Sequence, residues 1–80
     1  MDDDEIVQRI NQLADEEHRL ERSEGVDGLA EDEQRRLREL EIALDQCWDL
    51  LRQRRARRHA GLDPDDVAVR DPGVVEGYRQ

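Results

Sequence analysis

The chain has 80 residues, of which 35% are hydrophobic and 44% are charged, with one Trp, one Tyr and no Phe. It can form one small domain at most, and its composition excludes β-sandwiches and barrels, which need many more branched and aromatic residues. The net charge of −9 argues against general affinity for nucleic acids or anionic membranes, and no apolar run approaches the roughly 20 residues of a transmembrane helix.

The first predicted helix covers residues 3–23. The acidic run DDDE at residues 2–5 suits a helix start, because carboxylates accept hydrogen bonds from free N–H groups and meet the positive end of the helix dipole. Apolar residues then recur at the spacing of one helical face: Ile6, Ile10, Leu13 and Leu20. Glu17 is the one charged residue on this inner face.

A turn is expected over residues 24–29, because GVDG at residues 25–28 is typical of a short connection between antiparallel helices. The second helix is predicted over residues 30–60. Ala30 stands where a Ser or Asp cap is usual, and Gly61 is a stop signal.

The second helix has the clearest pattern in the chain. Its apolar residues step by three and four positions along one face: Leu37, Leu40, Leu44, Cys47 and Leu51. The same register continues into Arg54 and Arg58, so that the face becomes basic at its end. Residues 35–60 carry eight Arg and four acids, a net charge of +4, in a chain whose first 34 residues carry thirteen acids and three Arg, a net −10.

Two amphipathic helices joined by a short turn predict an all-α fold, an antiparallel coiled-coil-like hairpin over residues 1–60. Folding at the turn brings the acidic start of the first helix to the basic end of the second. It also places Glu17 near Arg35 and Arg36, which would give that inner acid a partner.

The second helix has apolar residues outside its main face, namely Ile42, Ala43, Trp48 and Leu50. Two explanations remain open, since a lone hairpin has no use for so broad an apolar face. Either the C-terminal segment folds back over it, or two copies form a homodimer with a four-helix bundle. We favour the homodimer, and the two explanations are compatible.

Residues 61–80 are predicted to form an extended C-terminal arm. The arm carries Val67, Val69, Val74, Val75 and Tyr78, more apolar content than a solvated tail requires. We expect it to dock on the overhanging end of the second helix or on a partner.

A protein-interaction surface is predicted from the apolar residues of the second helix and the arm: Trp48, Leu50, Leu51, Val74, Val75 and Tyr78. A second candidate site, for phosphates of nucleic acid or other anions, is the basic run Arg52, Arg54, Arg55, Arg57 and Arg58. The simplest interpretation of that run is a helix end matched to its own dipole and to the DDDE acids. An acidic protein partner and nucleic acid stay open as alternatives.

No catalytic or metal-binding residues are predicted, and no cofactor. Asp15 and His18 form a D-x-x-H pair on the outer face, and Glu17 with Glu41 could join a metal site in a dimer, but a solvated charged face explains them better. Cys47 is expected to be a small buried hydrophobe. With one Ser, two His and no Thr, no catalytic triad can be built, so we do not expect an enzyme.

The chain begins MDDDE, acidic where a signal peptide is basic, and its single Cys47 excludes a disulfide framework within the chain. We therefore expect a cytoplasmic protein that does not enter the membrane.

Three blocks, EIVQRINQLADEEHRL, LRELEIALDQCWDLLRQRRA and VVEGYRQ, cover nearly the whole chain, and DQCWDLLRQRR at residues 45–55 is the most specific stretch. Together they resemble a family of small actinobacterial proteins, domain of unknown function 2630. Ala30 departs from the family pattern, which more often has Ser or Thr there. The resemblance implies a compact bacterial cytoplasmic protein, and it transfers no functional residues, because the family has no assigned activity.

These observations predict a non-catalytic module for protein interaction or oligomerisation. The alternative is a nucleic-acid-associated regulator that uses the Arg-rich end of the second helix.

Overall fold

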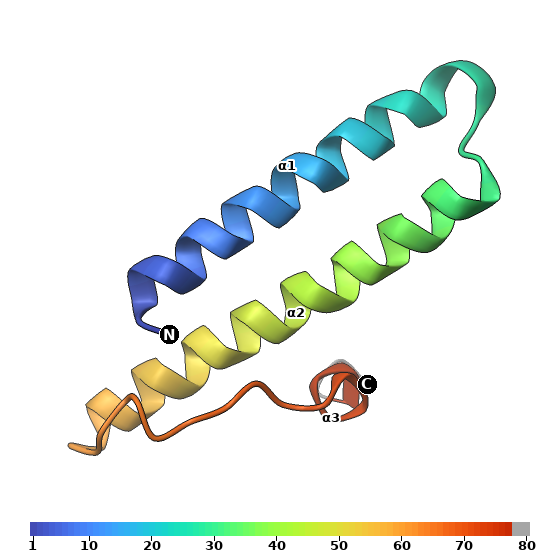
Figure 1. Ribbon diagram of the computed structural model, residues 1–80. Coiled ribbons are helices and arrows are strands. Elements are labelled where there is room, and N and C mark those ends of the chain that lie inside the picture. The colour runs from blue at the N-terminus through green and yellow to red at the C-terminus, as the bar shows by residue number, and fades with distance from the viewer. Residues whose placement is uncertain (78–80) are drawn as a thin grey trace.

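The computed structural model describes the backbone of residues 1–77 and the side chains of residues 1–22 and 28–75. Its helices are α1 (Asp3–Asp27), α2 (Glu31–His59) and the short α3 (Pro72–Gly77). The two long helices lie side by side and antiparallel (Figure 1). The predicted all-α hairpin is therefore confirmed.

A capping box starts α1. The Asp2 carboxylate accepts a hydrogen bond from the Glu5 backbone N–H at 2.8 Å, and the Glu5 carboxylate accepts one from the Asp2 N–H at 3.3 Å. The two acids thereby satisfy N–H groups that have no partner inside the helix. The acidic run at residues 2–5 acts as the helix start that its sequence predicts.

The end of α1 differs from the prediction. The helix continues to Asp27, four residues beyond the expected end at residue 23, and includes the first three residues of GVDG. Gly28 ends it with a φ of +72°, a conformation that L side chains rarely adopt. The connection to α2 is therefore only three residues long, residues 28–30, because one glycine is enough to break the helix.

The start of α2 has half a capping box. The Glu33 carboxylate accepts a hydrogen bond from the Ala30 backbone N–H at 3.2 Å, but Ala30 has no side-chain oxygen to accept one in return. The backbone at Ala30 already has the extended conformation of an N-cap, with φ −63° and ψ 160°.

Replacing Ala30 with Thr is therefore expected to raise the free energy of unfolding by about 0.5–1 kcal/mol, because the new hydroxyl can accept a hydrogen bond from the start of the helix. Urea unfolding measures the change. Ala30→Val has nearly the same shape without the oxygen and should bring no gain. An equal effect of both substitutions would contradict the capping explanation.

A Schellman motif ends α2. The Leu62 N–H donates to the Arg57 carbonyl at 2.8 Å and the Gly61 N–H donates to the Arg58 carbonyl at 3.1 Å, with Gly61 at φ +75°. Gly61 is thus the stop signal that the sequence predicts. The motif reverses the chain, so that residues after 61 run back along α2.

The core lies between the two long helices and continues under the arm. Its buried apolar residues are Ile6, Ile10, Leu13, Leu40, Leu44, Leu50 and Leu51, with Cys47 and Val67 among the partly buried residues packed against them. The predicted faces of both helices lie in this core or against it except for Leu37, which is only half-buried and does not belong to it. Leu50 lies outside the seam predicted for the second helix, and its burial shows that the apolar face of α2 is broad.

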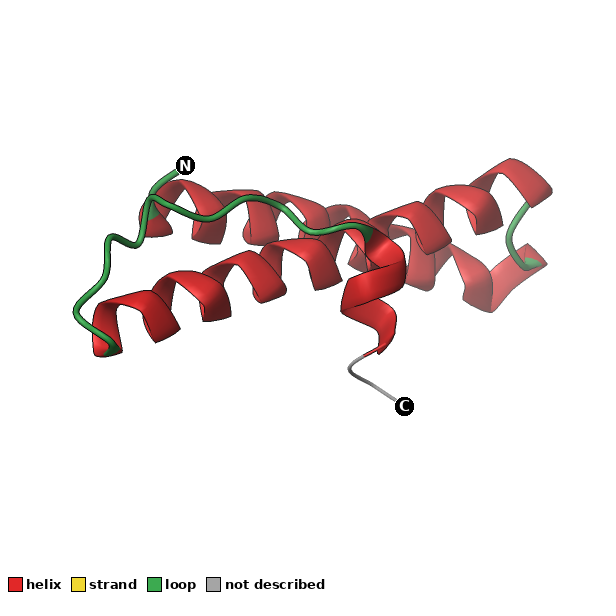
Figure 2. Cartoon of the chain, turned by 90° about the horizontal axis from the view of Figure 1, so that it is seen from below, coloured by secondary structure: helices red, strands yellow, loops and turns green. Residues whose placement is uncertain are grey.

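The C-terminal arm folds back on its own chain. It runs antiparallel to α2 and ends in α3, which crosses α2 near its middle (Figures 1 and 2). Val75 on α3 is buried. The predicted extended arm is therefore interrupted by a turn at residues 63–66 and ends in a helix, and it covers part of the broad apolar face of α2. The four-helix bundle of two copies stays a prediction.

Candidate interaction surface

A buried carboxylate anchors the middle of the arm. Asp49 on α2 is 1% exposed. Arg70 of the arm binds it with two donors, Nε to Oδ2 at 2.9 Å and Nη2 to Oδ1 at 2.8 Å, and Gln53 adds a third at 2.9 Å. A bidentate guanidinium with a further amide donor is the arrangement that a buried carboxylate requires. The arm is thus held in one register along α2.

Two glutamines fasten the backbone of the arm on either side of this pair. The Gln46 amide donates to the Arg70 carbonyl at 3.2 Å, and the Gln53 amide donates to the Ala68 carbonyl at 3.4 Å. Gln46, Asp49 and Gln53 are spaced by three and four residues and therefore share one face of α2. This face is occupied by the arm.

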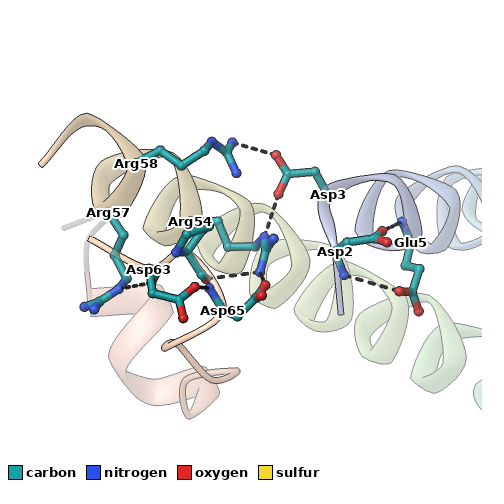
Figure 3. A network of polar contacts seen from close by, with 9 residues as sticks. Asp2, Asp3, Glu5, Arg54, Arg57, Arg58, Asp63 and Asp65 are labelled. Atoms are coloured by element: carbon teal, nitrogen blue, oxygen red, sulfur yellow. Dashed lines mark hydrogen bonds and ion pairs between the residues drawn. The ribbon is translucent and has the colours of Figure 1, made fainter. Parts of the chain in front are cut away.

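The basic end of α2 binds acids of its own chain (Figure 3). Arg54 is 5% exposed and donates to Asp3 at 2.5 Å, to Asp65 at 2.8 Å and to the Pro64 carbonyl at 3.1 Å. Arg58 donates to the other oxygen of Asp3 at 2.6 Å. Arg54 thereby ties the start of α1, the end of α2 and the arm together.

The two guanidinium groups change the acidity of Asp3. Hydrogen bonds from Arg58 and Arg54 stabilise its charged form and lower its pKa from 3.8 to about 2. The pKa is lower in the folded chain than in the unfolded one. The ion pairs therefore stabilise the fold fully above about pH 4, and this stabilisation is lost as the pH falls toward 2.

We expect the stability advantage of the native chain over an Asp3→Asn variant to be constant above about pH 4 and to shrink as the pH falls to about 2. Urea midpoints measured between pH 7 and pH 2 give this difference directly. Asp4→Asn, which changes an exposed neighbour in the same helix turn, controls for the loss of one negative charge. A difference independent of pH would show that Asp3 does not act through its charge.

An open groove of about 610 Å³ lies between α2 and the arm. We call it the Trp48 groove; its lining residues are Asp45, Trp48, Asp49, Arg52, Gln53, Ala56, Arg70 and Val75. Trp48 is 45% exposed. Arg52 is also exposed, and over the described side chains it makes no hydrogen bond or ion pair. The groove thus has an aromatic ring and a guanidinium that the fold itself does not use.

A smaller hollow on the other side of Trp48 is acidic. Glu17 from α1 and Glu41 and Asp45 from α2 line it together with Leu44 and Trp48. Burial is the main cause that raises the pKa of Glu17, and the negative charges of Glu21 and Glu41 raise it further. Three carboxylates therefore lie close together in this hollow.

The expected pairing of Glu17 with Arg35 and Arg36 is wrong. Arg36 instead forms a bidentate pair with Glu16, at 2.5 Å and 2.9 Å, and lowers the pKa of that carboxyl. Adjacent helix residues point about 100° apart, so this pair turns Glu17 toward Glu41 and away from Arg36.

A Glu17→Gln variant is therefore expected to be more stable than the native chain at pH 7. The raised pKa means that the protonated form is favoured in the fold, so its stabilisation is present below the ordinary pKa of 4.5 and is lost as the pH rises. The gain should disappear near pH 3, where Glu17 is neutral. Thermal unfolding at pH 7 and pH 3 measures it, and Glu16→Gln, which removes the ion pair with Arg36, should have the opposite sign at pH 7.

The structure divides the predicted interaction residues into two groups. Leu50, Leu51 and Val75 are buried within their own chain and so are not available at any surface. Trp48 and Val74 are exposed. Tyr78 lies outside the described residues.

The predicted basic run divides in the same way. Arg54 and Arg58 bind Asp3, and Arg57 donates to the Asp63 carbonyl at 2.5 Å and to Asp66 at 3.3 Å. Arg54 and Arg58 thus meet one of the DDDE acids, as the simplest interpretation of the run expects, whereas Arg57 meets groups of the arm. Only Arg52 and Arg55 are exposed without a hydrogen bond or ion pair to any described side chain.

Comparison with known families identifies the chain. The family described as "Protein of unknown function (DUF2630)" matches residues 2–80. The chain belongs to this family. The resemblance stated from the sequence blocks is thereby confirmed, and actinobacterial relatives agree with it.

Relatives of this DUF2630 protein occur in mycobacteria. An uncharacterized protein of Mycobacterium bovis (strain ATCC BAA-935 / AF2122/97) and one of Mycobacterium tuberculosis (strain ATCC 25618 / H37Rv) are each 49% identical over 77 residues, covering 95% of this chain and 88% of theirs. No solved structure matches the chain.

The structure of this DUF2630 protein also places the other residues that were considered from the sequence as candidates for metal binding or chemistry. Asp15 and His18 are exposed on the outer face of α1. Cys47 is partly buried against the core, and burial raises the pKa of its thiol. Over the described residues, no three His, Cys, Asp or Glu side chains are grouped so as to hold a metal ion, and no helix combines the length and apolar character that crossing a membrane requires.

Two features of this DUF2630 protein are not predicted from its sequence, the Asp49–Arg70 anchor and the acidic hollow. A signal for the anchor exists, because Asp49 is the only acid between residues 46 and 60, in an otherwise basic stretch. Its partner lies 21 residues further along the chain, beyond the reach of helical periodicity. The hollow depends on which way Glu17 points, and only the packing of α1 on α2 decides that.

Proposed function

We propose that this chain acts by binding protein and not by catalysing a reaction, and that the Trp48 groove is its contact surface. The observation that carries the proposal is the exposure of Trp48. Leu50 and Leu51, which follow shortly after it on α2, are buried. Trp48, the largest apolar side chain of the chain, is nearly half exposed.

The chemistry of the groove fits a protein contact. Trp and Arg are the residue types that contribute most to binding at protein interfaces, because they bury large areas and make several directional contacts. Trp48 and Arg52 are one helical turn apart and line the same groove. Val74, on the nearby α3, is also exposed. The homodimer that the sequence predicts is the simplest form of such a function.

Two observations support a non-catalytic role. Asp49, the one buried carboxylate in the groove, is engaged by Arg70 and Gln53 and serves the docking of the arm. Cys47 is a poor nucleophile, since burial raises the pKa of its thiol and reactivity needs the thiolate.

The chain has less basic surface for binding nucleic acid, the alternative function, than its sequence suggests. Three of the five arginines of the predicted run bind acids or carbonyls of their own chain. Arg52 and Arg55 remain, and two phosphate contacts on a chain of net charge −9 supply little affinity.

Capture experiments in the organism that encodes the chain test the proposal. Tagged native chain and a Trp48→Ala variant are purified from nuclease-treated lysate, and the proteins that accompany them, including untagged copies of the chain, are identified by mass spectrometry. Binding is then repeated with the purified partner. We expect a partner that resists nuclease and is lost with Trp48→Ala.

Val69→Ala is the matched control, because it also truncates an exposed apolar side chain but lies outside the groove. Its capture should equal that of the native chain. Loss of every partner on nuclease treatment would favour nucleic acid. The proposed contact surface would be overturned if the Trp48→Ala variant captured the same proteins as the native chain, or if the bait alone were recovered.

A further inference from the structure

One exposed side of α2 carries an aromatic ring and two guanidinium groups in a row. Trp48, Arg52 and Arg55 are spaced by four and three residues, so they share this side of the helix. We call these three residues the Trp48 strip. Their Cα atoms span about 10 Å along the helix axis, at 1.5 Å per residue. Trp48 and Arg52 also line the Trp48 groove.

The charges of the strip have no partner in the described part of the fold. All three of its side chains are exposed, and neither of its arginines makes a hydrogen bond or ion pair with a described side chain. The other arginines of this helix end are used differently. Arg54, Arg57 and Arg58 each bind an acid of their own chain. The two cations that the described fold does not use therefore both lie beside the exposed tryptophan.

The arm shows what this end of α2 binds on another of its sides. Arg54 donates to Asp65 at 2.8 Å (Figure 3). Arg57 donates to Asp66 at 3.3 Å. Val67 follows these acids directly and packs, partly buried, against the core. A short run of carboxylates next to an apolar side chain is thus a segment that guanidinium groups of α2 hold in this fold. The strip offers the same combination of cations and apolar surface.

The charges around Trp48 decide on which side of it the acids of a partner would lie. Glu41 and Asp45 precede Trp48 on α2 and line the acidic hollow with it. Carboxylates of a partner are unfavourable beside those acids and favourable beside Arg52 and Arg55. These two arginines lie about 6 Å and 10 Å from Trp48 along the helix axis. An extended chain advances about 3.3 Å per residue, so its acids are expected about two and three residues from the side chain that contacts Trp48.

We infer that the Trp48 strip binds an acidic segment of another protein, with an apolar side chain against Trp48 and carboxylates paired with Arg52 and Arg55. Guanidinium and carboxylate groups match in shape and can form two parallel hydrogen bonds, which makes such pairs specific. The tryptophan supplies apolar area at the centre of the contact. This inference rests on the proposed function, because it names the chemistry of the partner at the same site.

The net charge of −9 does not prevent this contact. Exposed charges are screened beyond about 8 Å at physiological salt, so two or three carboxylates at the strip respond mainly to its arginines. A nucleic-acid duplex carries one negative charge per about 1.7 Å and would also meet the acids of this chain. It has no apolar side chain to place against Trp48. A short acidic segment of a protein therefore fits the strip better than nucleic acid does.

Peptide selection with the purified full chain tests the inference. The probe is a display library of short random peptides, which contains acidic, basic and apolar segments without prior choice. We expect enrichment of peptides in which an aromatic or aliphatic residue lies about two to three residues from Asp or Glu. A selected peptide should shift Trp48 fluorescence to shorter wavelength, and its binding should weaken as salt is added. No enrichment, or enrichment of basic or purely apolar peptides, would overturn the inference.

Charge reversal tests the geometry. A double variant, Arg52→Glu with Arg55→Glu, changes two exposed positions that make no ion pair with a described side chain, so it should keep the helical fold, which circular dichroism checks. We expect it to bind a selected acidic peptide at least about tenfold more weakly, and a selection repeated on it to favour basic peptides. Trp48→Ala should weaken the acidic peptide at least about tenfold as well.

The matched control is the double variant Arg35→Glu with Arg38→Glu, which makes the same charge change at two exposed positions of α2 outside the strip. It should bind the acidic peptide as the native chain does. Equal losses in the two double variants would mean that net charge and not the strip decides binding, and would overturn the inference.

Other occupants of the strip would be recognised directly. Duplex DNA or single-stranded RNA that binds the native chain more tightly than the selected peptides would overturn the inference in favour of nucleic acid. A Trp48-dependent homodimer that excludes the peptides, measured by sedimentation velocity, would overturn it in favour of a second copy. A partner captured from lysate that is lost with Trp48→Ala but kept by the Arg52→Glu, Arg55→Glu variant would overturn this inference and leave the proposed function standing. The two proposals can thus fail separately.

Discussion

Replacing Asp49 with alanine is expected to lower the free energy of unfolding by about 3 kcal/mol and to release the arm from α2. The substitution removes a buried carboxylate that accepts three hydrogen bonds, two from Arg70 and one from Gln53. Breaking one side of a buried ion pair costs this much because the remaining donors lose their acceptor inside the fold. Eighty-residue domains are stable by roughly 4–12 kcal/mol, so the loss is a large fraction.

Urea unfolding gives the energy, and amide hydrogen exchange locates the effect. Exchange should quicken over residues 62–77 more than in α1, since the arm loses its central anchor. Asp15→Ala, the same change at an exposed position of α1, should alter stability by no more than about 0.5 kcal/mol.

A double variant with Asp49→Ala and Arg70→Ala separates the ion pair from other effects. It should cost less than the two single substitutions added together, because the second change removes a donor that already lacks its acceptor. Additive costs would mean that the two side chains do not act as a pair. Unchanged exchange in the arm after Asp49→Ala would mean that apolar packing of Val67 and Val75 alone holds it.

Replacing Leu40 with alanine is expected to cost about 3 kcal/mol, because Leu40 is 1% exposed at the centre of the α1–α2 contact. The cost has two parts. The variant buries less apolar surface on folding, and the smaller side chain leaves a cavity in the core. A core of seven buried apolar residues cannot absorb such a loss by rearranging elsewhere.

Leu62→Ala provides the matched control, since the same atoms are removed from a side chain that is 52% exposed. Its effect should stay within about 0.5 kcal/mol. Thermal unfolding by circular dichroism compares both variants with the native chain. Comparable losses at the two positions would contradict the placement of the core.

The charged residues of this chain serve two different purposes. Asp3 with Arg54 and Arg58, and Asp49 with Arg70, join segments more than twenty residues apart and fix how the helices and the arm dock. Arg52 and Arg55, by contrast, make no ion pair with another described side chain. Because the core is so small, apolar packing alone does not hold the arm in one register, and specific ion pairs are needed in addition.

The sequence by itself determined the two long helices, their apolar faces and their antiparallel pairing, because helical periodicity and turn residues are local properties. It also placed the acidic start of α1 at the basic end of α2, which the contacts of Asp3 with Arg54 and Arg58 confirm. It did not determine the end of α1, since a helix can continue through GVDG until a residue with positive φ stops it at Gly28.

Only the tertiary structure decided which charges meet. Glu16, not Glu17, reaches Arg36, and this choice depends on a rotation of about 100° of one helix against the other, which periodicity does not resolve. Likewise Asp49 is an interior residue because the arm docks over it, and its partner Arg70 lies 21 residues further along the chain. Local patterns specify helices, whereas the docking of helices and arm specifies which side chains remain for a partner.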